Sequence, residues 1–246
     1  MILFLGCSLT WGQGLYIEKW LSEGKDEKFC NRNSVPIFDA ELLSYEDDLY
    51  RRENHFPNIV SQHFNRSYSC KRFNGGSNND IVKIIDNLSK GQADKIDLVV
   101  IQFTDMTRDD EFAPISLNEW GELIEVIPQY QILKIHKKMT ELKLPWLALC
   151  WHEEHSNFFN KFLQNKLIKV RFQEKTYRNI ASMNQFVKDS IKFMNQDEKD
   201  EVTTFELCDK YPNINDGHPT LEWHEVVAES IIKKIQDEDI QFRKYN

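Results

Sequence analysis

Residues 96–104, IDLVVIQFT, form an almost unbroken apolar run, and this run constrains the fold more than any other segment of the chain. A strand with one solvated face alternates apolar and polar residues, whereas a strand covered on both faces is apolar throughout. Similar runs stand at 1–6 and 144–151, and weaker strand-like segments stand at 68–74 and 201–209. The sequence therefore predicts a five-stranded sheet that is buried between helices.

Amphipathic segments separate these strands. Apolar residues recur at helical spacing in 55–64, 78–90, 129–143 and 220–239. Strands that alternate with helices indicate crossover connections and a parallel sheet. We therefore predict an α/β fold, a three-layer α/β/α sandwich around a central, mostly parallel five-stranded sheet. Ligands of such sheets bind beyond the carboxyl ends of the strands.

Two regions depart from this repeating pattern. Residues 16–54 are polar and acid-rich, and residues 153–200 carry a helical pattern rich in Lys and Asn. A chain of 246 residues suits one large domain. We interpret residues 1–246 as a single domain in which both regions are insertions that cover the site.

Composition narrows the class of protein. The net charge is −8 and no block of Lys or Arg stands out, which argues against a nucleic-acid partner. No run approaches the roughly 18 apolar residues that cross a bilayer, so no membrane partner is expected. The start of the chain lacks a basic n-region, and five scattered cysteines form no CxxC pair. We expect a reduced, cytoplasmic protein without a cofactor or a metal.

Polar residues at the predicted strand ends suggest nucleophilic catalysis. Ser8 follows the first strand, and His218 stands in a loop before the last helix, with Asp216 two residues earlier. Nucleophilic hydrolysis needs a hydroxyl, a base, a group that orients the base, and donors for the oxyanion. We predict these roles for Ser8, His218 and Asp216, with the backbone amides of Ser8 and Gly76 as oxyanion donors.

Three segments carry a resemblance to a known family. GCSLTWGQGL (6–15), FNGGSNNDIV (73–82) and DGHPTLEWHEVVAESI (216–231) resemble, in this order, sequence blocks of the SGNH (GDSL-like) hydrolase superfamily. The resemblance implies a flavodoxin-like fold and a serine esterase or deacylase. Its substrate would be a small-molecule or carbohydrate carboxylic ester, such as a carbohydrate O-acetyl ester.

The chain departs from the family pattern at three places. Cys7 replaces an aspartate that supports the first loop, and Thr104 replaces an asparagine that donates to the oxyanion. Asn78 or Asn79 could supply the missing donor. Losing one oxyanion donor raises the activation free energy by about 3 kcal/mol. Asn215 stands at the usual spacing of the triad acid, although Asp216 carries the carboxylate.

Further residues are candidates for substrate contact. These are Trp11, Arg108 and His152, with a core position for Trp11 and a local ion pair for Arg108 as alternatives. The WHEEH segment (151–155) lacks the spacing of the zincin motif, so we predict no metal site. Two other functions stay open: an O-acyltransferase that uses the same triad, and a non-catalytic binding or structural module.

Overall fold

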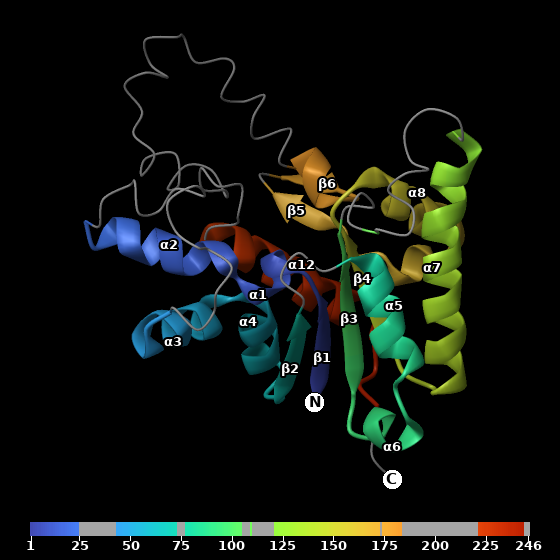
Figure 1. The fold of residues 1–246 in the computed structure, drawn as a ribbon, viewed down its shortest axis with the longest axis horizontal. Helices are drawn as coiled ribbons and strands as arrows, with labels where there is room; N and C mark the ends of the chain where they lie inside the picture. The colour runs from blue at the N-terminus through green and yellow to red at the C-terminus, as the bar shows by residue number, and fades with distance from the viewer. Residues whose placement is uncertain are drawn as a thin grey trace.

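The sheet at the centre of the molecule is parallel, and its strand order is β2-β1-β3-β4 (Figure 1). The structure, a computed structural model, describes residues 1–24, 43–72, 77–104, 109, 121–172, 174–183 and 221–243. The strands are β1 (Ile2–Gly6), β2 (Tyr68–Arg72), β3 (Leu98–Phe103) and β4 (Trp146–Cys150). In the described part of the chain this sheet has four strands rather than five. The fifth predicted strand, at 201–209, lies outside the described residues.

Strands β1, β3 and β4 bury both of their faces, which explains their unbroken apolar runs. Phe4 of β1 and Val100 of β3 belong to one core, which also contains Phe56 and Val227 from helices on that side. Their chain neighbours point the other way, so that Leu5 lies in the second core. Because side chains alternate along a strand, an apolar run feeds both cores. Helices thus cover both faces of the sheet.

The helices divide between these two faces. Those that pack on the first core are α4 (Phe56–His63) and α12 (Leu221–Asp237). Those that pack on the second core are α5 (Asn78–Asp86), α6 (Lys90–Ala93), α7 (Gly121–Glu141) and α8 (Glu153–Phe162). None of the helices in the described ranges is both long enough and apolar enough to span a bilayer.

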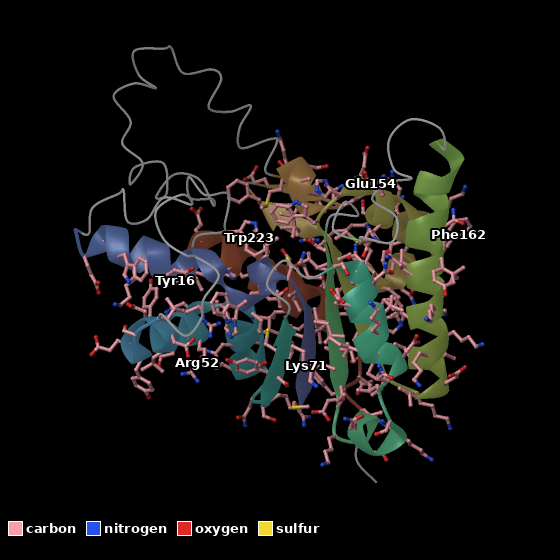
Figure 2. The ribbon with its side chains drawn as sticks, in the orientation of Figure 1. Tyr16, Arg52, Lys71, Glu154, Phe162 and Trp223 are labelled. Carbon is pink, nitrogen blue, oxygen red and sulfur yellow. The ribbon has the colours of Figure 1, made fainter. Side chains whose placement is uncertain are left out.

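The first predicted insertion contributes two helices. These are α2 (Gln13–Ser22), which follows the short α1 (Ser8–Trp11), and α3 (Tyr45–Asn54). Tyr16 lies between α2 and α3 and is almost completely buried (Figure 2). The salt bridge from Lys19 of α2 to Asp47 of α3, at 2.8 Å, also joins the two helices.

The second predicted insertion is helical only in part. Helix α8 ends at Phe162 and is followed by a 3-10 turn, η5 (Gln164–Lys166). An antiparallel hairpin of β5 (Val170–Phe172) and β6 (Lys175–Tyr177) follows, where we had predicted helix. Residues 168–172 alternate apolar and polar, and the apolar ones pack on α12, so the period-2 pattern decides the local structure.

Candidate functional site

The candidate site lies at the carboxyl ends of β1, β2 and β3. In the order β2-β1-β3-β4, β2 lies on one side of β1, and β3 and β4 lie on the other side. The strand order therefore reverses between β1 and β3. Sheets of this kind bind ligands at such a switch point, outside the carboxyl ends of the two strands. Ser8 opens α1 just after β1, Asn78 opens α5 after β2, and Thr104 follows β3. Three of the predicted site residues therefore follow neighbouring strands.

The turn after β1 is fixed to β3 by one buried glutamine. The Cys7 thiol and the Thr10 hydroxyl both donate to Oε1 of Gln102, at 3.3 and 3.0 Å. Gln102 Nε2 donates to the Phe103 carbonyl at 3.0 Å. A Cβ on Gly6 would lie 2.0 Å from Thr10 Oγ1, so only glycine allows this close approach. Cys7 thus bonds to the neighbouring strand at the position where the resembling family has its supporting aspartate.

Helix α3 holds the end of α1 from the outside. Arg51 Nη1 donates to the Trp11 carbonyl at 2.6 Å, and its guanidinium lies 4.4 Å from the centre of the Trp11 ring. Asp48 accepts from Arg51 Nε and Nη2 at 3.1 and 2.5 Å. Trp11 is 3% exposed, so its indole belongs to the packing of this turn. Substrate contact by Trp11 stays a prediction.

Asn78 and Thr104 are bonded to each other. Asn78 Oδ1 accepts the Thr104 N–H at 2.8 Å, and Asn78 Nδ2 donates to the Thr104 carbonyl and to Asp109 Oδ2, both at 3.2 Å. An amide group has two N–H donors, so both donors of Asn78 already have acceptors. The Thr104 hydroxyl makes no hydrogen bond to a described residue.

Asp109 is the centre of a buried polar network that the sequence did not reveal. Its carboxylate is fully buried and accepts the Asn79 N–H and Gln131 Nε2, each at 2.9 Å. A carboxylate only accepts, so the Gln131 nitrogen must face it and Gln131 Oε1 must face His155 Nε2, at 3.1 Å. His155 Nε2 therefore carries a proton. The sequence did contain one signal for this network: Gln131 is a polar residue one helical turn before Ile135, on the buried face of the helix.

Two buried histidines pack near the turn that follows α1. Burial lowers the pKa of His224 well below its usual value, and its Nδ1 accepts the Phe56 N–H at 3.3 Å. Burial and the charge of Arg51 lower the pKa of His55 to about 3. His55 Nε2 lies 3.0 Å from the Tyr68 hydroxyl. Both rings are neutral at pH 7 and enclosed, so neither is an accessible base.

Several predicted site residues lie outside the described residues. They are Gly76, Arg108, Asp216, His218 and the side chain of Ser8. Their roles remain predictions. His152 is half-buried at the start of α8, with its ring 6.3 Å from that of Trp151. Within the described ranges, no group of three His, Cys, Asp or Glu side chains could hold a metal ion.

Fold and site together define an α/β protein with a central parallel sheet, helices on both of its faces, and polar residues at its carboxyl edge. No family model matches the chain, and no curated protein matches it. Among solved structures, the crystal structure of the lipase Lip_vut3 from a goat rumen metagenome is similar. It shares 14% identity over 95% of this chain and 96% of that chain, with a TM-score of 0.42. A likeness this low carries no argument about function.

Proposed function

We propose that this chain is an SGNH-type serine hydrolase that cleaves a carboxylic ester, with a carbohydrate O-acetyl ester as the expected substrate. The observation that carries the proposal is the position of Ser8. It opens α1 at the carboxyl end of β1, beside the β1–β3 switch point, in a turn that Gln102 bonds to β3. This is where a parallel sheet of this order presents residues to a ligand.

The proposed reaction has two steps. Ser8 Oγ attacks the ester carbonyl carbon while His218 takes the hydroxyl proton, and Asp216 orients the imidazole. The tetrahedral intermediate collapses to an acyl-serine, and His218 returns the proton to the leaving alcohol. Water then attacks the acyl-serine with the same base, which releases the carboxylate and restores Ser8.

The described contacts of Asn78 support one choice of oxyanion donors within this proposal. Both N–H donors of Asn78 are engaged within the protein, so we assign the hole to the backbone amides of Ser8 and Gly76. The Thr104 hydroxyl supplements them because it has no described partner. Asn78 instead holds the start of α5 against the end of β3. It supports the loop and does not touch the substrate.

The test is labelling with a fluorophosphonate probe together with hydrolysis of p-nitrophenyl acetate. Ser8→Ala abolishes labelling and lowers turnover by up to about 10⁶-fold, and His218→Ala has a comparable effect. Ser22→Ala is the matched control because Ser22 is an exposed serine at the end of α2. Hydrolysis by Ser8→Ala at the wild-type rate would refute the mechanism.

The triad acid is tested separately. Asp216→Asn lowers turnover by about 10⁴-fold if its carboxylate stabilises the imidazolium, and Asn215→Ala then has little effect. The reverse result would assign the orienting role to Asn215 and remove Asp216 from the proposal.

A non-catalytic binding module is the second candidate. The engaged donors of Asn78 favour it, because the side-chain donor expected at this position is already used. In that case folded wild-type protein stays unlabelled by the probe under conditions that label a reference serine esterase. Labelling at Ser8 excludes this candidate.

A further inference from the structure

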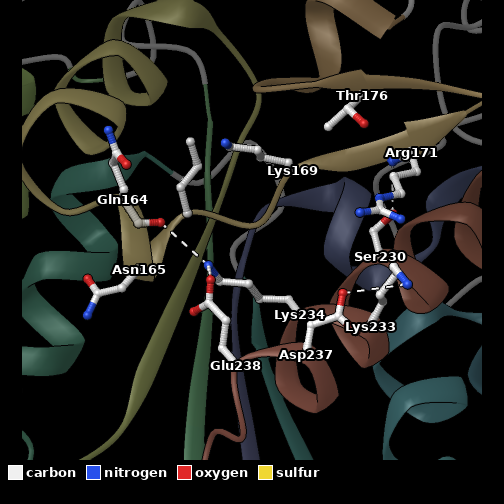
Figure 3. A pocket seen from close by; sticks show the side chains of 11 residues that line it. Gln164, Asn165, Lys169, Arg171, Thr176, Ser230, Lys233, Lys234, Asp237 and Glu238 are labelled. Atoms are coloured by element: carbon white, nitrogen blue, oxygen red, sulfur yellow. Dashed lines mark hydrogen bonds and ion pairs between the residues drawn. The ribbon is translucent and has the colours of Figure 1, made fainter.

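A cavity lies between the second half of α12 and the β5–β6 hairpin (Figure 3). Its volume is about 440 Å³, which falls within the range of small-molecule sites. Lys169 and Thr176 lie on the hairpin side, and Lys234 and Glu238 lie on the α12 side. Gln164 of η5 also lines the cavity.

The cavity has more positive than negative groups. Its charged side chains are four cations and two carboxylates: Lys169, Arg171, Lys233, Lys234, Asp237 and Glu238. Lys233 pairs with Asp237 at 3.5 Å. Lys234 pairs with Glu238, and its Nζ also lies 3.5 Å from the Gln164 carbonyl oxygen. Lys169 and Arg171 have no carboxylate partner among the described residues, which leaves two positive charges in a chain of net charge −8.

Tertiary structure holds these two cations at the cavity. Val170 and Phe172 point into the core, so the alternation along the strand turns Lys169 and Arg171 to the opposite face. The Arg171 N–H donates to Ser230 Oγ of α12 at 3.1 Å, which fixes the hairpin on the helix. Thr176 is the register partner of Arg171 and adds a hydroxyl to the lining.

The two carboxylates that line the cavity are already paired with Lys233 and Lys234. An anion in the cavity would therefore find its opposite charges in Lys169 and Arg171. A guanidinium beside ammonium groups is the arrangement that proteins use for phosphate oxygens.

We propose that this cavity binds the phosphate group of a small molecule, a dianion that matches Lys169 and Arg171, the two lining cations without a carboxylate partner among the described residues. The Arg171 guanidinium donates to two phosphate oxygens, and Lys169 and Thr176 donate to the remaining ones. The site requires neither Ser8 nor ester hydrolysis, so it stands independently of the hydrolase proposal.

The test is isothermal titration of the full chain with inorganic phosphate and with pyrophosphate, at constant ionic strength. Wild type binds at least one of them with a Kd of about 1 mM or tighter. The double variant Lys169→Ala/Arg171→Ala weakens binding about tenfold or more. The matched control is Lys90→Ala/Lys95→Ala, which removes two exposed lysines near α6 and changes the Kd by less than about twofold. Circular dichroism verifies that each variant is folded.

A gain-of-binding variant makes the test independent of any loss of folding. Asp237→Asn releases the half-exposed Lys233 from its ion pair, so phosphate binds about threefold tighter. No saturable binding by wild type overturns the proposal. Equal weakening by the Lys90/Lys95 control also overturns it, because it shows attraction by overall charge and not by this cavity.

Discussion

Replacing Gln102 with leucine tests how the turn that carries Ser8 is held. Gln102 is 1% exposed and joins this turn to β3 through Cys7 and Thr10. In Gln102→Leu the buried Thr10 hydroxyl loses its partner, which costs about 1–3 kcal/mol. Two other lost hydrogen bonds add little to this cost. The Cys7 thiol is a weak donor, and the Phe103 carbonyl still accepts the Trp151 N–H at 2.9 Å. We expect a loss of about 2 kcal/mol in the free energy of unfolding.

Urea unfolding and thermal melting measure this loss. For a chain of this size, 2 kcal/mol corresponds to a fall in Tm of about 4–8 °C. A double-mutant cycle with Thr10→Val isolates the hydrogen bond between the two side chains. We expect a coupling energy of about 1–2 kcal/mol, because the double variant leaves no orphaned hydroxyl. Gln62→Leu, at an exposed position of α4, is the control and changes stability by less than about 0.5 kcal/mol.

The same variant connects stability with the proposed activity. At a temperature where both proteins are folded, the fluorophosphonate probe labels Gln102→Leu more slowly, since a displacement of about 1 Å costs up to about 10²-fold. A coupling energy near zero, or a Gln102→Leu protein as stable as Gln62→Leu, would refute our account of this turn.

Three further predictions follow from buried or strained positions. The folded-state pKa of His55, about 3 against an ordinary 6.5, means that only the unfolded chain binds its proton between these values. Stability is therefore full above pH 6.5 and falls towards pH 3 by up to about 1.4 kcal/mol per unit. His55→Phe flattens this slope in urea unfolding between pH 7 and 5, and an unchanged slope would contradict the prediction. Gly12 has φ +86°, and an added Cβ would lie 3.0 Å from His55 Cβ, so Gly12→Ala loses about 2–4 kcal/mol. Gly24→Ala, at φ +74° with nothing within 4 Å, loses only about 1–2 kcal/mol, and equal losses would argue against a clash. Asp109→Asn turns an amide donor towards other donors and loses about 2–4 kcal/mol. The half-exposed Asp86 is the control, and Asp86→Asn costs less than about 1 kcal/mol by the same thermal melt.

The sequence determined the layers of the fold through burial. The apolar runs at 1–6, 96–104 and 144–151 predicted β1, β3 and β4. A strand between two helical layers has no solvated face, so both of its faces carry apolar residues. The period of the apolar residues predicted α4, α5 and α12 for the corresponding reason. It also ordered Ser8, Asn78 and Thr104 after successive strands. The β5–β6 hairpin was missed because its strands are short and lie within a helix-like composition.

Only the tertiary structure decided which polar side chains meet. Asp109, Gln131 and His155 come from a loop and two helices, yet they form one hydrogen-bonded network. In the sequence, Gln102 is one polar residue in an apolar strand. Only the structure shows that it accepts hydrogen bonds from Cys7 and Thr10. The period of apolar residues in a sequence indicates which face of a helix or strand a residue lies on. It does not indicate which distant residue that side chain contacts, because this depends on how the helices pack on the sheet.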